Sequence, residues 1–226
     1  MKLFKMLVAL FKSVYFNFKV FPIKTAIKLP VIVSHNIKLY NLHAQTVLIE
    51  SQPTFGMIKF GWSQGSTGIS GRSEACKWSV DKNSKVIFKG RANLANGISV
   101  RCDNGGTIVF GENFICNSNC FFASNKRIEF GKDVLIGWNT NIRDVDGHKV
   151  YNANEREGNI LNPPKEIIIG SNVWVAAHVD ILKGVIIGDG CVVAYRACVT
   201  RRFDEKNCII GGFPAEVIKT NICWER

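Results

Sequence analysis

The chain has 226 residues, of which 46% are hydrophobic and 11% aromatic, and it carries a formal net charge of +11. This composition excludes a disordered chain, and the length fits one large domain, alone or with an appendage. The eight cysteines are dispersed and form no CxxC pair, which excludes a small disulfide scaffold and indicates a reducing, cytoplasmic location.

The N-terminal segment, residues 1–40, concentrates the positive charge. Seven lysines and no acidic residue lie in residues 1–49, so this stretch supplies +7 of the net charge. The lysines interrupt apolar runs such as MLVALF, which are far shorter than the roughly 20 residues of a spanning helix, and they also argue against a signal peptide. We expect a basic amphipathic helix that either lies on an anionic surface at the inner face of the membrane or packs on the protein or a sister subunit. Without arginines or a nucleic-acid motif, no nucleic-acid partner is expected.

A period of six residues runs through residues 169–199. Isoleucine or valine stands at every sixth position, namely Ile169, Val175, Ile181, Ile187, Val193 and Val199. Small or apolar residues follow four positions later, namely Val173, Val179, Val185, Cys191 and Ala197. A helix would repeat at three and four residues and a plain strand at two. The period therefore indicates short strands that bend at fixed intervals, three of which close a triangular coil of about 18 residues around the aliphatic side chains.

The same spacing extends upstream with less regularity. It links Phe88, Leu94 and Val100, then Phe110, Cys116 and Phe122, then Phe130, Ile136 and Ile142. The six-residue register breaks at residues 103–107, 124–128 and 148–166. We interpret each break as a loop that leaves the triangular prism formed by the stacked coils, and the last loop is the longest. We predict an all-β solenoid over residues 41–220, with LIES, MIKFGWS and KWSV as irregular early coils and residues 221–226 as a tail. Cys116 and Cys120 fall at small apolar positions, which favours packing over metal binding.

Three stretches, IGWNTNIRDVDGHK, IIIGSNVWVAAHVDILKGVIIGDGCVVAYRACVT and IIGGFPAEVIK, resemble the hexapeptide-repeat acyltransferases. The resemblance covers residues 86–220 and is strongest to O-acetyltransferases of capsular and other surface polysaccharides and to maltose and galactoside O-acetyltransferases. It implies a left-handed parallel β-helix and a homotrimer with sites between subunits. It also implies acetyl-CoA as co-substrate and a saccharide hydroxyl as acceptor, in surface-polysaccharide biosynthesis.

The turn DVDGHK supplies the candidate catalytic residues. His148 stands at the position of the family's catalytic histidine, which implies a general base for direct attack of the sugar hydroxyl on the thioester. Asp144 and Asp146 share a face with it in an extended segment, so either one orients the imidazole while the other holds the sugar, or both only shape the turn. The resemblance places Asn119 and Asn117 beside the acceptor, although asparagines are also ordinary turn residues of this repeat. Trp138 is either a sugar-stacking platform or a packed side chain.

The resemblance also assigns the acetyl-CoA groove, which lies between two prisms, to the later hexads. The matching positions are Ala176, Ala177 and Ala194 for the pantetheine, and Thr200, Arg201, Arg202 and Lys219 for the phosphates. For the basic residues, simple surface solvation is the alternative. The chain departs from the family pattern at Tyr195-Arg196, Phe213 and Glu216, which puts the adenine-end contacts in question. His178 is expected to face outward, near this groove or a subunit contact.

Two other functions stay open. One is N-acetylation of an amino sugar, a nucleotide-sugar or a small amine, and the other is a catalytically silent scaffold for glycan synthesis. Zinc chemistry of the γ-carbonic-anhydrase kind is disfavoured, because only His148 and His178 lie on regular coils and no His-x-His pair occurs, so we expect no metal.

Overall fold

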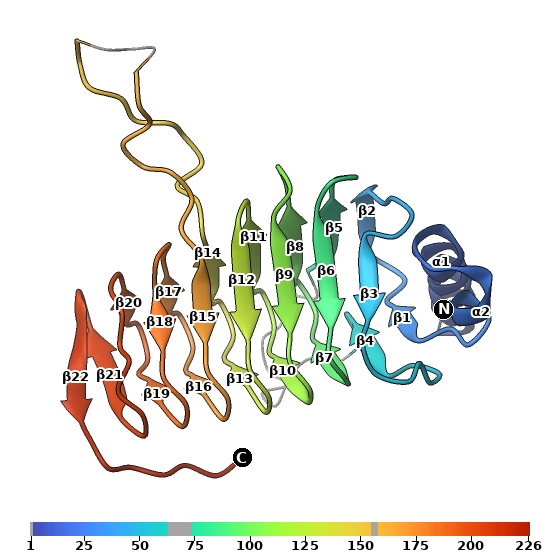
Figure 1. The fold of residues 1–226 in the computed structure, drawn as a ribbon. Helices are drawn as coiled ribbons and strands as arrows, with labels where there is room; N and C mark the ends of the chain where they lie inside the picture. Colours follow the sequence, from blue (N-terminus) through green and yellow to red (C-terminus); the bar gives the residue numbers. More distant parts are fainter. Residues whose placement is uncertain (1, 63–73, 155–157) are drawn as a thin grey trace.

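A computed structural model describes residues 2–62, 74–154 and 158–226, and in it the strands wind into a three-sided solenoid (Figure 1). Consecutive strands pass in turn through sheets A, B and C. Sheet A contains β1 (Val31–Val33), β4 (Ile58–Phe60), β7 (Ala92–Leu94), β10 (Phe114–Cys116), β13 (Leu135–Ile136), β16 (Trp174–Val175), β19 (Val192–Val193), β21 (Ile209–Gly212) and β22 (Ala215–Lys219).

Sheet B contains β2 (Lys38–Asn41), β5 (Lys77–Val80), β8 (Ser99–Cys102), β11 (Phe121–Ser124), β14 (Asn141–Arg143), β17 (Asp180–Ile181) and β20 (Cys198–Val199). Sheet C contains β3 (Val47–Ile49), β6 (Lys85–Phe88), β9 (Thr107–Phe110), β12 (Arg127–Phe130), β15 (Ile167–Ile169) and β18 (Ile186–Ile187). Within these described strands all pairs are parallel except β21 with β22, which are antiparallel. The early coils predicted around residues 47–80 are confirmed as β3, β4 and β5.

The six-residue period is the structural repeat, as predicted. Val175 pairs with Val193 and Ile181 pairs with Val199, so each residue meets its equivalent 18 positions further on. All six aliphatic positions from Ile169 to Val199 are at most 1% exposed. Their burial on the solenoid axis is the main source of stability, because each buried side chain of this size contributes about 1.5–3 kcal/mol.

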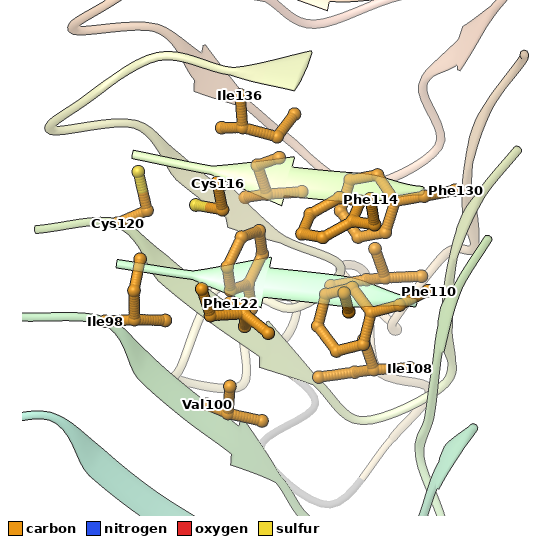
Figure 2. Packing of buried hydrophobic residues seen from close by; sticks show 14 of the residues in the cluster. Ile98, Val100, Ile108, Phe110, Phe114, Cys116, Cys120, Phe122, Phe130 and Ile136 are labelled. Carbon is orange, nitrogen blue, oxygen red and sulfur yellow. The ribbon is translucent and has the colours of Figure 1, made fainter. Parts of the chain in front are cut away.

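Phenylalanines fill the middle coils of the core (Figure 2). The Phe110 ring lies nearly parallel to Phe88, at 5.1 Å and 20°, and to Phe130, at 5.6 Å and 1°. Phe114 and Phe122 meet the same ring in tilted and edge-on geometries. The stack forms because equivalent positions of successive coils lie one strand spacing apart, about 4.8 Å.

Cys116 and Cys120 lie in the same core, each 1% exposed, so the prediction of packing is confirmed (Figure 2). Burial, with the neighbouring Cys120 thiol, raises the pKa of Cys116 well above its usual value. A thiol held neutral in this way behaves as a small apolar side chain. No group of three or more metal-ligating side chains gathers within the described ranges.

Two of the three predicted loops are wrong. Residues 103–107 form a tight corner between β8 and β9, where Gly106 N–H donates to Asp103 O at 2.9 Å and Asn104 and Gly105 take positive φ. Only Asn125 and Lys126 separate β11 from β12. An extra residue at a corner widens the turn without expelling the chain, so these register breaks stay within the coil. The third break does protrude, as predicted, between β14 and β15 (Figure 1), although its residues 155–157 lie outside the described part.

Helices α1 (Lys2–Val20) and α2 (Ile23–Ala26) lie at the N-terminal end of the solenoid (Figure 1). The predicted basic helix is therefore present, and it packs on the solenoid through the buried side chains of Ala9, Phe16 and Val20. The solenoid itself begins at β1, before residue 41, because β1 pairs with β4 and buries Val31 and Val33. Among the described residues, neither helix combines the length and hydropathy that crossing a bilayer requires.

Candidate active site

His148 follows β14 by five residues, in the first part of the chain that leaves sheet B. Figure 1 shows this segment protruding from the solenoid between β14 and β15. Asn162, on the returning arm, fixes the foot of this segment: its Nδ2 donates to His148 O at 2.8 Å, and its Oδ1 accepts from Val150 N–H at 2.7 Å. The His148 side chain is exposed, and its ring has no hydrogen-bonding partner within the described residues. An imidazole so placed is free to take a proton from a ligand.

Asp146 is the acidic neighbour of this histidine, and two hydrogen-bond donors stabilise the ionised form of its carboxyl group. Its Oδ2 accepts from Lys183 Nζ at 2.5 Å and from Asn162 Nδ2 at 2.9 Å. The hydrogen bond from Lys183, followed by that from Asn162, lowers the pKa of Asp146 below its ordinary value. Lys183 follows β17, so this contact also ties the loop to the next coil.

Asp144 has a different environment, since it is fully buried. Its carboxylate accepts from Ser124 Oγ and Asn125 N–H, both at 2.7 Å, and from Lys126 N–H at 2.9 Å. These donors belong to the corner between β11 and β12 in the preceding coil. Asp144 therefore closes the corner that lies next to the loop.

A groove of about 980 Å³ runs along sheet A on the outer side of β10, β13, β16 and β19. Five of the residues predicted from the sequence line it together: Asn117, Trp138, Ala176, Ala177 and Ala194. Its walls are mainly apolar, with Trp174 39% and Tyr195 56% exposed on the same surface. The small alanine side chains leave the floor open, which suits a slender flexible chain such as pantetheine.

The C-terminal tail forms one wall of this groove, which the sequence analysis did not foresee. The Trp224 ring lies 6.0 Å from that of Trp174, and its Nε1 donates to Asn172 O at 2.8 Å. Arg226 donates to the carbonyls of Asn113 and Val134, each at 3.2 Å. The signal in the sequence was a tryptophan in the short C-terminal tail, and a lone tryptophan does not indicate where on the solenoid the tail packs.

Asn119 and His178 lie at the corner where sheet A turns into sheet B. Asn119 has a positive φ of 62°, and its Oδ1 is buried without a hydrogen-bonding partner among the described residues. The His178 ring lies 5.4 Å from that of Tyr195, and its Nε2 is 3.3 Å from Asn139 Nδ2. His178 thus stands at the rim of the groove, next to one of the positions that depart from the family pattern.

The predicted phosphate-binding residues lie elsewhere. Thr200, Arg201 and Arg202 follow β20 and occupy the edge between sheets B and C, the edge from which His148 also emerges. Arg201 lies over the Phe203 ring, 5.1 Å from its centroid, and Arg202 pairs with Asp204 at 3.2 Å. Lys219 ends β22, exposed at the C-terminal end of sheet A.

The candidate residues therefore form two groups on opposite edges of sheet B. The apolar groove reaches the edge between sheets A and B, whereas His148, Lys183 and Arg201 line the edge between sheets B and C. A single chain does not bring the histidine and the groove together.

Comparison with known proteins gives three consistent results. A family model described as bacterial transferase hexapeptide (six repeats) matches residues 166–201. The galactoside O-acetyltransferase of Escherichia coli (strain K12) is 35% identical over 115 residues, which cover 51% of this chain and 55% of that enzyme. The chain thus spans little more than half the length of this curated relative.

Solved structures agree. A maltose O-acetyltransferase from Clostridium difficile 630 is 31% identical, with a TM-score of 0.50, over 62% of this chain and 70% of that one. A polysialic acid O-acetyltransferase matches in fold over 87% of both chains, with a TM-score of 0.55 at 21% identity. The solenoid, the repeat and these likenesses place the chain in the hexapeptide-repeat acetyltransferase family, whose fold is a left-handed parallel β-helix.

Proposed function

We propose that the protein is an acetyl-CoA-dependent O-acetyltransferase that acts on a saccharide hydroxyl in surface-polysaccharide biosynthesis. The observation that carries the proposal is the exposed imidazole of His148, which has no hydrogen-bonding partner in the described part of the chain and is held at a fixed loop foot on a rigid solenoid. Relatives named as galactoside and maltose O-acetyltransferases favour a sugar hydroxyl as the acceptor.

The chemistry needs one base and one acyl donor. The His148 imidazole removes the proton from the sugar hydroxyl as its oxygen attacks the thioester carbonyl, and the tetrahedral intermediate then expels the CoA thiolate. The imidazolium returns the proton to that thiolate, so the histidine is regenerated. No acyl-enzyme intermediate is required.

Asp146, rather than Asp144, is the residue we assign to orienting the imidazole. Asp144 is buried and its carboxylate is used at the corner between β11 and β12. Asp146 stays negatively charged beside Lys183, and its Oδ1 has no partner within the described residues. A carboxylate in that state stabilises the imidazolium that forms during the reaction.

The donor is proposed to lie in the groove of sheet A, with pantetheine along Ala176, Ala177 and Ala194 and the acceptor near Asn117 and Trp138. Because His148 lies across sheet B from this groove, we propose that the site forms between two subunits of a homotrimer. Arg201 and Arg202 on the histidine edge would then approach the phosphates from the neighbouring subunit.

Purified protein with acetyl-CoA and a panel of oligosaccharides tests the proposal, with CoA release and product mass as readouts. His148→Ala is expected to lower kcat by roughly 10²- to 10⁴-fold. His43→Ala is the matched control, since His43 lies in neither group of candidate residues, and it should keep the wild-type rate.

Each alternative has its own outcome. Turnover with amines alone would replace O-acetylation by N-acetylation. Wild-type CoA release by His148→Ala would remove the assigned base. A failure of every saccharide and amine acceptor would favour a scaffold.

A further inference from the structure

The outward face of α1 is strongly apolar. Its exposed large side chains are Leu3, Phe4, Met6, Leu7, Leu10, Phe11, Val14, Tyr15 and Phe18, of which Phe4 and Phe11 are 70% and 73% exposed. Phe55 and Trp62 extend this surface from the first coils, and together with Leu3, Leu7 and Leu10 they line a hollow of about 310 Å³. Apolar surface gathered in this way normally marks an interaction site.

The inward face of α1 is attached to the free edge of β1. Ser13 Oγ accepts from Val33 N–H at 2.9 Å, while Asn17 donates to Val31 O at 2.6 Å and accepts from Val31 N–H at 3.2 Å. These backbone groups point along the solenoid axis, because strand hydrogen bonds run from coil to coil. The helix therefore covers the end of the solenoid (Figure 1), and its opposite face looks along the axis, away from the coils.

Residue spacing fixes what that opposite face contains. Phe4, Phe11 and Phe18 recur every seven residues and lie about half a turn from the buried Ser13 and Asn17. Lys5, Lys12 and Lys19 recur at the same interval along one flank of the phenylalanines. Lys5 and Lys19 are exposed there, whereas Lys12 Nζ donates to the carbonyls of His35 and Ile37, both at 2.8 Å. The end of the molecule is thus an apolar plane bordered by positive charge.

Charge decides between the two candidate occupants of this plane. Residues 1–49 carry seven lysines and no acidic residue, so a second copy meeting this end would bring like charges together. An anionic lipid surface is complementary to both the lysines and the phenylalanines, as for other amphipathic helices that lie in the interface.

We propose that α1 docks the protein end-on to an anionic membrane, with the solenoid standing away from the lipid. The loop foot of His148 follows β14, four strand spacings of about 4.8 Å beyond β2, and the helix beneath is about 10 Å thick. The imidazole is then held roughly 30 Å above the lipid surface. If the proposed acetyl transfer holds, a histidine at this height can reach only an acceptor hydroxyl at a similar distance from the lipid. The acceptor is then a glycan whose reactive hydroxyl lies several sugar units from a lipid anchor.

Vesicle binding tests the surface without requiring activity. The full chain should sediment with phosphatidylglycerol/phosphatidylcholine vesicles and not with phosphatidylcholine alone. The triple variant Phe4→Ser, Leu7→Ser, Phe11→Ser should bind at least about tenfold more weakly, because these exposed side chains insert on docking. Its matched control, Phe213→Ser with Ile218→Ser, removes exposed apolar surface at the other end and should bind as the wild type does.

The lysines have a matched control of equal charge. Lys5→Gln, Lys19→Gln, Lys24→Gln should weaken binding to anionic vesicles, whereas Lys82→Gln, Lys126→Gln, Lys132→Gln should not. If the two sets weakened binding equally, the attraction would depend on net charge alone, and the proposal that α1 is the docking face would be wrong. Failure of the wild type to bind, with self-association abolished by the triple serine variant, would assign the face to a second copy.

Energy transfer to labelled lipid tests the orientation. The exposed Cys223 is a natural attachment site, because its neighbour Trp224 bonds to Asn172 just before β16, five strand spacings from β1. Phe55→Cys in a Cys223→Ser background carries the dye near the first coil. End-on docking predicts that the Cys223 dye lies about 24 Å further from the lipid, and equal distances would contradict it.

Discussion

Asp144 illustrates how one buried side chain supports the loop that carries His148. Its carboxylate satisfies two backbone N–H groups and one hydroxyl at the corner between β11 and β12. Loss of that carboxylate leaves the N–H groups buried without acceptors, which costs about 1–3 kcal/mol for each group.

Asp144→Ala is therefore expected to lower the free energy of unfolding by at least about 2 kcal/mol, measured by urea denaturation. Asp146→Ala is the matched control, because the Asp146 carboxylate is 44% exposed and water can replace it as a partner of Lys183, so its loss should cost little stability. The control should instead lower kcat by weakening the orientation of His148. Equal stability of the two variants would contradict the assignment of Asp144 to the corner.

The sequence alone could not separate these two aspartates. The spacing of residues 144, 146 and 148 places all three on one face of an extended segment, and both carboxylates have the same local context. What distinguishes them comes from other coils: Asp144 meets Ser124 of the preceding coil, and Asp146 meets Lys183 of the following one. Such partners are 20 and 37 residues away in the chain and carry no motif.

At the scale of elements, the aromatic stack is the feature whose packing is most sensitive to a single substitution. Phe110 is fully buried and contacts Phe88 of the preceding coil and Phe130 of the following one. Phe110→Ala removes a ring from a packed stack and leaves a cavity that neighbouring coils cannot close.

We expect Phe110→Ala to lower the free energy of unfolding by about 3–5 kcal/mol, seen as an earlier transition in urea. Phe213→Ala, at a position 83% exposed, removes the same ring from the surface and should change stability little. A small effect of Phe110→Ala would mean that the stack does not hold adjacent coils together.

The elements were predictable to the extent that each one repeats. The hexad residues from Ile169 to Val199 could be assigned to the interior because burial follows the period. The corners at residues 103–107 and 124–128 were misread as loops because an inserted residue shifts the period whether or not the chain leaves the coil. The tail over the groove was missed because Trp224 belongs to no repeat.

At the scale of the whole molecule, the candidate site is divided by sheet B. The groove carries the apolar residues predicted for the donor, and the opposite edge carries His148 with Lys183 and Arg201. The sequence identified the residues of both groups but not that the groups lie on opposite edges of sheet B. Each coil passes through both edges within a few residues, so nearness in the chain does not show on which edge a residue lies. A site that uses both groups requires a second copy.

Subunit complementation tests this account most directly. His148→Ala removes the base, and Ala176→Trp fills the groove while leaving the histidine edge intact. Each variant alone should be inactive in acetyl transfer from acetyl-CoA to an oligosaccharide. Doubly tagged mixed trimers, co-expressed and purified on both tags, should regain about a third of the wild-type activity, because at one of their three interfaces a histidine from one subunit meets an open groove from the next. Mixed oligomers as inactive as the separate variants would contradict a site shared between subunits.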